Sequence, residues 1–328
     1  MKTKLFSMLS LFIGLTILFP AYSQETYKQD SKHDPKFKKQ KSYTKSYSVS
    51  SSDRISLDNQ FGEMKIITWE KNEVKVDASI TAMSDEESDV QKLLDKISIT
   101  DDKSGNTVSF KTKFANEKES KTDKNTHVNQ SMKINYTVYL PAGSPLTAKN
   151  QFGPLVIGDY RGEANLESQF GSLTTGKITN AKNIKVGFGK ATLGQINNGK
   201  IDIQYSTGTI NKLVGDVDLK LQFSNAVKVN VDNDVKSLDI DNSYSTLYLD
   251  LSKNLSASYN ISTSYGSFKN KSNFKIDGDS KKDYMTSKYS GTSGSGGIKL
   301  TVRSSFGSVI VGHDLQVDTS GKKKSATI

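Results

Sequence analysis

The sequence predicts an all-β fold, a parallel β-solenoid of about 18–21-residue coils wound as a right-handed single-stranded β-helix. Three observations predict it. An aromatic residue recurs at nearly regular spacing, a glycine or serine follows each aromatic, and apolar residues alternate with polar ones on both sides. Alternation with a period of two is typical of a strand that buries one face. Coils of this length are too short for a β-α-β unit, which needs about 30 residues.

The aromatic recurs nine times, and the copies from Phe152 to Tyr265 lie 17 to 21 residues apart. Two short strands joined by a corner cannot bury their apolar face alone, so the copies are expected to stack. Parallel stacking at about 4.8 Å per coil would superpose the rings as an internal, inward-facing ladder. The expected ladder consists of Phe61, Phe152, Phe170, Phe188, Tyr205, Phe223, Tyr244, Tyr265 and Phe306.

The residue after each aromatic is always glycine or serine, and the apolar alternation changes phase by one residue there. A phase change keeps the apolar side chains on one face only if the backbone bends at this position. Because serine replaces glycine in three copies, small size explains this position better than a positive φ. The expected corners are Gly62, Gly153, Gly171, Gly189, Ser206, Ser224, Ser245, Gly266 and Gly307.

Before the aromatic stands glutamine in five copies, serine in three and Gly187 in one. This column is expected to face outward. It is either a ladder of amides and hydroxyls that stabilises the stack or a flat polar stripe for glycan contact. The candidate polar face consists of Gln60, Gln151, Gln169, Gln204 and Gln222.

The chain divides by composition into five segments. Residues 1–23 read as a secretory signal peptide, with a basic start, an apolar run and a cleavage site near Ser23. The first coil and a small α/β cap inserted after it occupy 48–147, where Ser84 and Glu87 suggest a capping box at the start of a helix over 84–96. Residues 148–315 hold the other coils, with a flexible loop at 278–297.

The formal net charge of +10 is concentrated at the chain ends. Residues 24–47 contain seven Lys against three acids, and the last eight residues contain three Lys and no acid. We therefore expect a basic flexible arm at 24–47 and a basic tail at 316–328. They are either solvated or tethers to an anionic envelope surface. The body between them lacks the basic stripe of a nucleic-acid groove.

The sequence offers little chemistry. The chain has no Cys, and its three His residues are too scattered for a zinc site. Neither a metal nor another cofactor is expected. The alternatives for one acidic cluster are a solvated strand face, a Ca²⁺ site and a pair of catalytic carboxylates. This cluster consists of Asp232, Asp234, Asp239 and Asp241.

The signal-like start, the strand-rich block that ends "VYLPAGSPLTAKNQFGPLVIGDYRGEANLESQFGSL" and the strand repeats resemble the bacterial adhesin-domain family. These are secreted β-strand-repeat proteins of unknown function, and the resemblance covers about residues 48–315. It implies adhesion, carries no catalytic residues across, and suggests an envelope-stress role by association alone.

We therefore expect a non-enzymatic, exported cell-envelope protein that acts as an adhesin-like or scaffolding module. The expected location is the periplasm, the outer surface or the extracellular space. The alternatives are a glycan- or polymer-binding module that uses the Gln/Ser column and a carbohydrate-active β-helix enzyme. The expected partners are an envelope polymer, a glycan or another surface protein, with no nucleic acid and no transmembrane segment in the mature chain. A flat mixed-charge face favours the first function, exposed aromatics the second and a deep acidic cleft the third.

Overall fold

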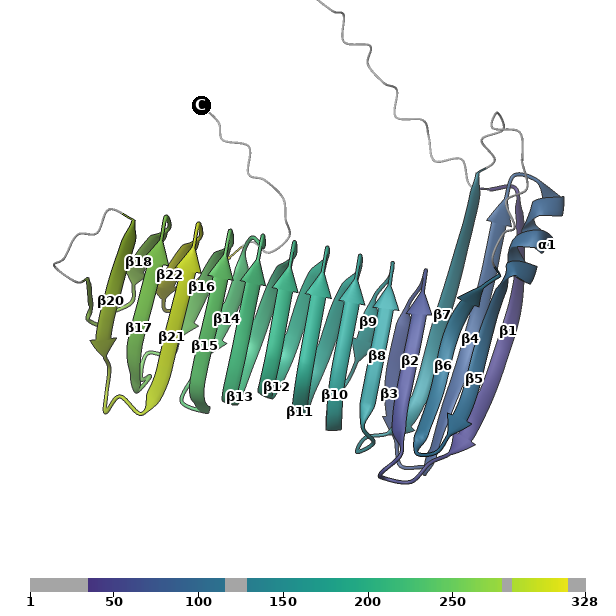
Figure 1. Cartoon of the computed structure of the whole chain (residues 1–328), viewed down its shortest axis with the longest axis horizontal. Helices are drawn as coiled ribbons and strands as arrows, with labels where there is room; N and C mark the ends of the chain where they lie inside the picture. Colours follow the sequence, from purple (N-terminus) through teal and green to yellow (C-terminus); the bar gives the residue numbers. More distant parts are fainter. Residues whose placement is uncertain (1–34, 116–128, 279–284, 318–328) are drawn as a thin grey trace, which may run out of the picture. The chain divides into compact units, whose positions relative to one another are not determined.

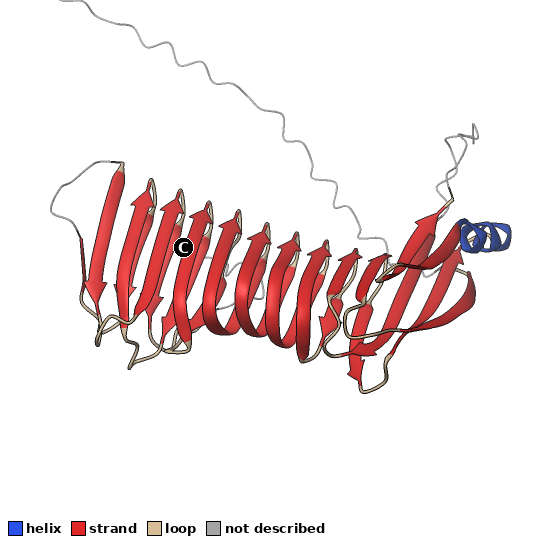
Figure 2. Ribbon diagram, turned by 60° about the horizontal axis from the view of Figure 1, so that its bottom comes forward, coloured by secondary structure: helices blue, strands red, loops and turns tan. Residues whose placement is uncertain are grey.

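The computed structural model describes residues 35–115, 129–278 and 285–317, which form strands and one helix (Figures 1 and 2). The prediction of a mostly β chain with mostly parallel pairing is confirmed. The elements are β1 (Phe37–Ser48), β2 (Arg54–Gln60), β3 (Met64–Trp69), β4 (Glu73–Ser84), α1 (Glu87–Lys96), β5 (Ile97–Ser104), β6 (Thr107–Phe114), β7 (Gln130–Pro141), β8 (Leu146–Gln151), β9 (Leu155–Ile157), β10 (Tyr160–Gln169), β11 (Ser172–Gly187), β12 (Lys190–Gln204), β13 (Thr207–Gln222), β14 (Val227–Val231), β15 (Val235–Ser243), β16 (Thr246–Leu251), β17 (Ala257–Ser264), β18 (Ser267–Lys271), β19 (Ile276–Gly278), β20 (Thr286–Thr292), β21 (Ile298–Ser305) and β22 (Ser308–Gly312).

The strands form two layers that the long strands β11, β12 and β13 join, because each of these runs through both layers (Figure 1). In one layer the order is β6-β2-β8-β10 and then the second halves of β11, β12 and β13, followed by β15, β21 and β17. In the other it is β7-β3-β9, the first halves of the same three strands, and then β14, β16, β22 and β18. All these pairs are parallel.

Antiparallel strands cover the N-terminal end of both layers and the C-terminal end of the layer that contains β17, whereas β18 pairs only with β22 among the described strands. At one end β4 pairs with β7, β1 with β4, and β5 with β6. At the other end β20 pairs with β17, and β19 pairs with β20. Such strands protect the repeats from pairing with another chain, because an open parallel edge exposes unpaired backbone groups.

The core lies between the two layers and consists of aliphatic side chains in register from strand to strand. Alternate residues of each strand point into it, so adjacent strands superpose their apolar residues in columns. One such column, four residues before each aromatic, is fully buried: Leu166, Ile184, Ile201, Leu219, Ile240, Val302 and Ile261.

The repeats do not stack in chain order at the C-terminal end. Strand β21, from the last repeat, lies between β15 and β17. The expected direct stacking of Tyr244 on Tyr265 is therefore wrong, because Phe306 lies between them at 4.8 Å from Tyr244 and 5.0 Å from Tyr265. This order also brings Arg303 to Asp239 and Asp241, with which it forms ion pairs.

The flexible arm expected over 24–47 is wrong for residues 37–47, which belong to strand β1; residues 24–34 lie outside the described residues. Tyr43 and Tyr47 are on the inward side of this strand and are partly buried. Lys41 donates hydrogen bonds of 2.5 and 2.6 Å to the carbonyl oxygens of Leu94 and Ile97. A lysine at the C-terminal end of a helix satisfies carbonyl groups that have no partner in the helix.

The capping box expected at Ser84 and Glu87 is also wrong. Ser84 is the buried last residue of β4, and α1 begins at Glu87 without a side-chain cap. The Ser84 hydroxyl instead accepts a hydrogen bond of 3.2 Å from the backbone N–H of Glu86. The expected loop over 278–297 is wrong in part as well, because residues 286–292 form the closing strand β20.

Asp101 joins β1 to β5 at the N-terminal end of the stack. Its carboxylate accepts hydrogen bonds from the hydroxyls of Tyr47 and Tyr43, the latter at 2.8 Å, and Lys45 lies 3.9 Å away. The bond from Tyr47 is the main cause that lowers the pKa of Asp101. The same bond raises the pKa of Tyr47 to about 12, so the tyrosine stays a donor at neutral pH.

We expect Asp101→Asn to destabilise the protein by about 2 kcal/mol at pH 7, since hydrogen bonds to a charged group are worth about 1.5–3 kcal/mol. A carboxyl with a lowered folded-state pKa adds stability above its unfolded pKa, and that stability is lost as the pH falls through the folded pKa. Urea unfolding between pH 7 and pH 3 should therefore show a smaller acid-side loss in the variant. An equal loss in both proteins would contradict this role of Asp101.

Candidate binding surface

The nine repeat aromatics form one column on the outside of the stack, not an internal ladder. Apart from Phe61, which is partly buried, their exposed fractions range from 45% to 61%. The prediction of an inward-facing ladder is therefore wrong. The aliphatic residues of the strands already fill the space between the layers, and the aromatics occupy the corners where the chain passes from one layer to the other. In Figure 1 these corners follow the arrowheads of β8, β10, β11, β12 and β13.

The rings stack face to face without interruption. Adjacent ring centroids are 4.7–5.0 Å apart and adjacent ring planes differ by only 3–10°. Phe114 ends the column at Phe61 with an edge-to-face contact at 5.6 Å. Nine rings at one strand spacing of about 4.8 Å make a column roughly 38 Å long. Its solvent side consists of ring edges, because the faces cover one another.

Each of the nine aromatics has a positive φ, between 48° and 62°. This left-handed conformation turns the chain at the corner, and it costs a non-glycine residue about 1–2 kcal/mol. Glycine or asparagine would adopt it at lower cost. Contacts between stacked rings, worth about 0.5–1.5 kcal/mol each, offset the strain. The strained conformation recurs at all nine aromatics, where the stacked rings compensate for it.

The small residue after each aromatic lies against the backbone of the neighbouring corner. A Cβ atom on Gly171 would lie 2.0 Å from the carbonyl oxygen of Gly153, and one on Gly189 would lie 1.7 Å from that of Gly171. Where serine stands instead, its hydroxyl takes part in the stacking: Ser206 accepts a hydrogen bond of 3.0 Å from the N–H of Gly189. Ser224 and Ser245 accept corresponding bonds from the corners before them.

The glutamine column lies directly beside the rings, on the layer that contains β8, β10 and β15. The Gln204 amide donates to the carboxylate of Asp202 at 2.9 and 3.0 Å. The Gln169 amide covers Gly187, the one copy without a side chain. Within the described ranges, the amides of Gln60, Gln151, Gln169 and Gln222 make no side-chain hydrogen bond, so this column is not an amide ladder. All of them are partly exposed and can bond to water or to a ligand.

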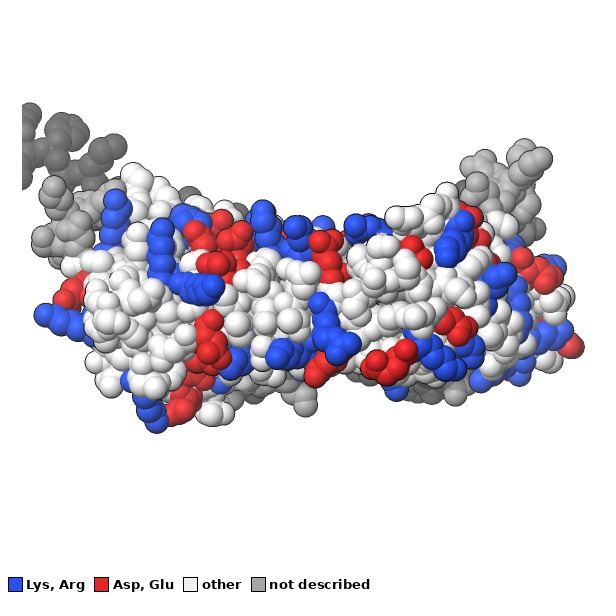
Figure 3. All heavy atoms as spheres, turned by 90° about the horizontal axis from the view of Figure 1, so that it is seen from below, with Lys and Arg blue, Asp and Glu red and all other residues white. Residues whose placement is uncertain are grey.

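A second column, two residues before the Gln column on the same layer, consists of charged residues. Their sign alternates across nine adjacent strands. Opposite charges on neighbouring strands attract, whereas like charges directly opposite would destabilise the sheet. The ion pair of Lys111 with Asp58 and that of Lys149 with Glu167, at 3.5 Å, belong to it. In stacking order the column is Lys111, Asp58, Lys149, Glu167, Lys185, Asp202, Lys220, Asp241 and Arg303. The face seen from below, opposite the aromatic corners, also mixes both signs (Figure 3).

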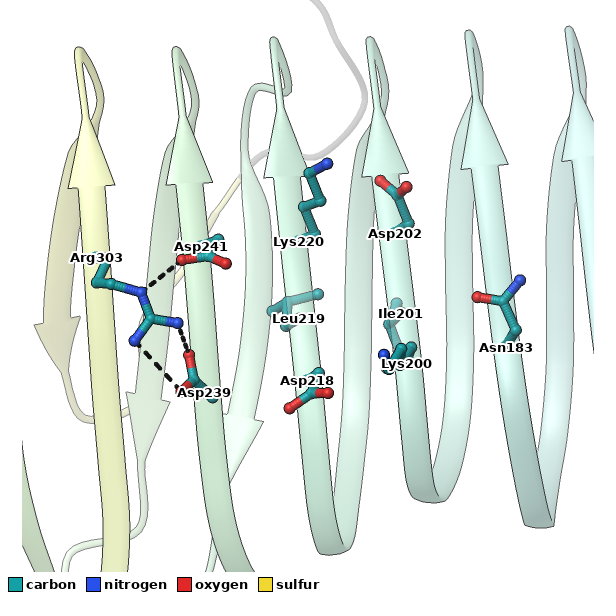
Figure 4. A pocket seen from close by; sticks show the side chains of 10 residues that line it. All are labelled: Asn183, Lys200, Ile201, Asp202, Asp218, Leu219, Lys220, Asp239, Asp241 and Arg303. Atoms are coloured by element: carbon teal, nitrogen blue, oxygen red, sulfur yellow. Dashed lines mark hydrogen bonds and ion pairs between the residues drawn. The ribbon is translucent and has the colours of Figure 1, made fainter.

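A shallow hollow of about 370 Å³ lies over β12, β13, β15 and β21, on the layer that contains the column of alternating charges (Figure 4). Arg303 bonds to both Asp239 and Asp241 there, the latter at 2.7 Å. The other two acids of the predicted cluster, Asp232 and Asp234, lie with Lys212 at 3.5 and 2.5 Å. The structure thus separates the cluster into two groups, each paired with a cation. Among the described residues, no group of three or more His, Cys, Asp or Glu could hold a metal ion.

The aromatic column has the size of an interaction surface. A Phe or Tyr ring exposed by about half leaves roughly 100 Å² uncovered, so eight such rings form a strip of roughly 800 Å². The largest apolar patch on a typical monomer is about 300–600 Å² and is often functional. These residues are recognisable from the sequence, but the expected inward side was wrong, because each aromatic stands at the turn and is not the last inward residue of its strand. The change of phase at every corner was the available sign that the chain turns there.

Trp69, the only tryptophan, packs near the junction of the repeats and the N-terminal cap. Its ring stacks on Tyr139 at 5.2 Å, and its indole N–H donates to the carbonyl oxygen of Glu73 at 2.7 Å. It lies eight residues beyond Phe61, at the far end of β3 from the aromatic column.

No protein-family model and no curated protein sequence matches the chain. Over most of its length the chain is similar to solved structures of bacterial proteins described as adhesins. A "putative adhesin" from Bacteroides fragilis is 13% identical over 83% of this chain and 97% of its own, with a TM-score of 0.41. A "putative adhesin" from Parabacteroides distasonis is 13% identical over 83% and 97%, with a TM-score of 0.35. A "putative lipid binding protein" from the same species is 11% identical over 82% and 96%, with a TM-score of 0.30.

In the part of the chain that the structure describes, no helix is both long and apolar enough to cross a membrane.

Proposed function

We propose that this protein is a non-enzymatic, exported module of the cell envelope that acts by adhesion, and that the aromatic column is its contact surface. The observation that carries the proposal is the uninterrupted row of half-exposed rings, each held in a strained backbone conformation. A row that extends over nine repeats suits an extended partner or a surface better than a small molecule.

The proposal includes a two-layered β-solenoid as the scaffold. Parallel pairing of successive repeats and the in-register columns support this architecture. In it, the repeats present one copy of the contact residue per strand spacing, so the length of the stack sets the length of the surface. A right-handed winding remains a prediction.

The proposal also includes attachment through the basic ends and a role in envelope stress, but it does not depend on either. The segments 24–34 and 318–328, which hold part of the expected positive charge, lie outside the described residues. Salt would weaken any attachment through them, since exposed charges are screened. Attachment through the rings should depend little on salt.

Replacing Phe170, Phe188 and Phe223 together by asparagine should lower binding to purified bacterial envelopes at least tenfold. Asparagine tolerates a positive φ and removes the ring edges, so the fold is retained. The matched control introduces asparagine at Thr174, Thr192 and Thr209, which form a column on the other layer. Co-sedimentation with envelopes measures both. If the ring variant binds as well as the control, the aromatic column is not the contact surface.

Glycan binding through the Gln column is a second candidate. Exposed aromatics were expected to favour it, and four of its amides make no side-chain hydrogen bond in the described part of the chain. Carbohydrates commonly stack on ring faces, however, and here the faces cover one another. Binding to a glycan array that Gln151→Ala and Gln169→Ala abolish, while the three asparagine substitutions leave it intact, would favour this candidate.

A further inference from the structure

We propose that the aromatic column docks into the interfacial layer of a zwitterionic phospholipid bilayer, with its long axis parallel to the membrane plane. This inference rests on the proposed use of the column as the contact surface and names its partner. It is drawn from the geometry of the rings, from the order of the side-chain columns beside them and from their charges.

The ring geometry favours a fluid partner. The rings present a continuous wall of edges, since neighbouring planes are nearly parallel and 4.7–5.0 Å apart. At that spacing no atom fits between neighbouring rings, so a second copy of the column cannot interdigitate. A sugar ring finds no free face along the column. Lipid acyl chains and glycerol groups rearrange around such a ridge and cover it on both sides.

The columns beside the rings follow the polarity of a membrane interface. The neutral amides come first, one residue from the rings, and the charges come three residues from them. At about 3.3 Å per residue, the charges lie roughly 10 Å from the rings along the strand. Interfacial segments bury their apolar side roughly 5–10 Å into the boundary between headgroups and acyl chains. Rings at that depth place the amides among the ester groups and the charged column among the headgroups.

The charged column matches a zwitterionic surface better than an anionic one. Its nine members alternate in sign and several of them pair with each other, so the column is close to neutral and suits a surface without net charge. An anionic surface would attract only the basic members. The three tyrosines of the column fit the same position, because tyrosine is enriched where membranes meet water. On the other side of the rings the residues two positions after each aromatic are neutral except Glu63 and Lys190: Pro154, Ser172, Thr207, Asn225, Thr246, Ser267 and Ser308.

The test uses the chain without residues 1–23, because their apolar run would itself bind lipid and they lie outside the described residues. We expect it to float with phosphatidylcholine vesicles, and about 0.5 M salt should not weaken this binding. Burying only half of the roughly 100 Å² that each ring leaves uncovered is worth about tenfold in partitioning. The triple asparagine variant at Phe170, Phe188 and Phe223 should therefore bind about a thousandfold more weakly, and the threonine control should bind like wild type.

A second measurement reports depth. Phe188→Trp places a fluorophore in the column, and brominated phosphatidylcholine should quench it. The native Trp69, at the far end of its strand, is the internal reference and should not be quenched in the wild-type chain. Quenching of both tryptophans, or of neither, would contradict the proposed orientation.

Three outcomes overturn the inference. The first is the absence of binding to phosphatidylcholine vesicles. The second is binding that needs anionic lipid and disappears in salt, which would assign attachment to the basic ends. The third is a ring-dependent dimer in sedimentation, which would make a second copy the partner. If vesicles do not bind but delipidated envelopes do, and the triple variant loses that binding, the proposed adhesion stands and its partner is a polymer.

Discussion

Gly189→Ala is expected to destabilise the protein by about 3 kcal/mol, although it adds a single methyl group to a partly exposed corner. The new Cβ would lie 1.7 Å from the carbonyl oxygen of Gly171 and 2.8 Å from its carbonyl carbon. No side-chain rotation relieves a contact with backbone, so two strands must separate and lose hydrogen bonds of the ladder. Forced overpacking of this kind costs about 1–3 kcal/mol or more.

The control for this substitution is Gly158→Ala. Gly158 is an exposed glycine without a positive φ, and no atom lies within 4 Å of the position of its Cβ. Its substitution should change the free energy of unfolding by less than about 0.5 kcal/mol. Urea unfolding of both variants tests the difference. Equal stability of the two would mean that the corners do not need a small residue, and that the regular glycine and serine column has another cause.

Ile203→Ala should cost about 3 kcal/mol, whereas Phe188→Asn, fifteen residues before it in the chain, should cost about 1 kcal/mol or less. Ile203 is fully buried, and truncation of such a side chain leaves a cavity. Phe188 is half exposed and contacts two neighbouring rings at 4.7 and 4.8 Å. Removing the ring loses those contacts, but asparagine adopts the positive φ of 54° with less strain than phenylalanine, which offsets part of the loss.

This comparison separates the two roles of the repeat residues. An internal ladder would require the Phe188 ring to stabilise the stack more than Ile203 does. Phe188→Asn would then lower the free energy of unfolding more than Ile203→Ala. A small cost at Phe188 together with a large loss of surface binding would show that the rings serve contact. If both substitutions lower the free energy of unfolding equally, the rings have a structural role.

Much of the scaffold follows from local regularity. Apolar residues with a period of two specify strands, and the seven nearly evenly spaced repeats from Phe152 to Tyr265 specify stacking, because one repeat cannot bury its apolar face alone. The small residue after each aromatic marks a close approach of backbones wherever the repeats stack in parallel. Strand β1 could also have been found, since Tyr43 and Tyr47 have the even spacing of one strand face, but its Lys content resembled that of a flexible arm.

The amino-acid pattern alone therefore predicts the β-repeat, its spacing and the residues that form each column. The tertiary structure alone decided three things. The rings face outward, because the aliphatic columns fill the core and the left-handed turn at each aromatic directs its ring away from it. Strand β21 lies between β15 and β17. Equivalent repeats can stack in more than one order, and only this order lets Arg303 contact Asp239 and Asp241. The charges of nine distant segments alternate, because strand register brings them together. Each of these depends on which strands become neighbours, a property that no single repeat contains.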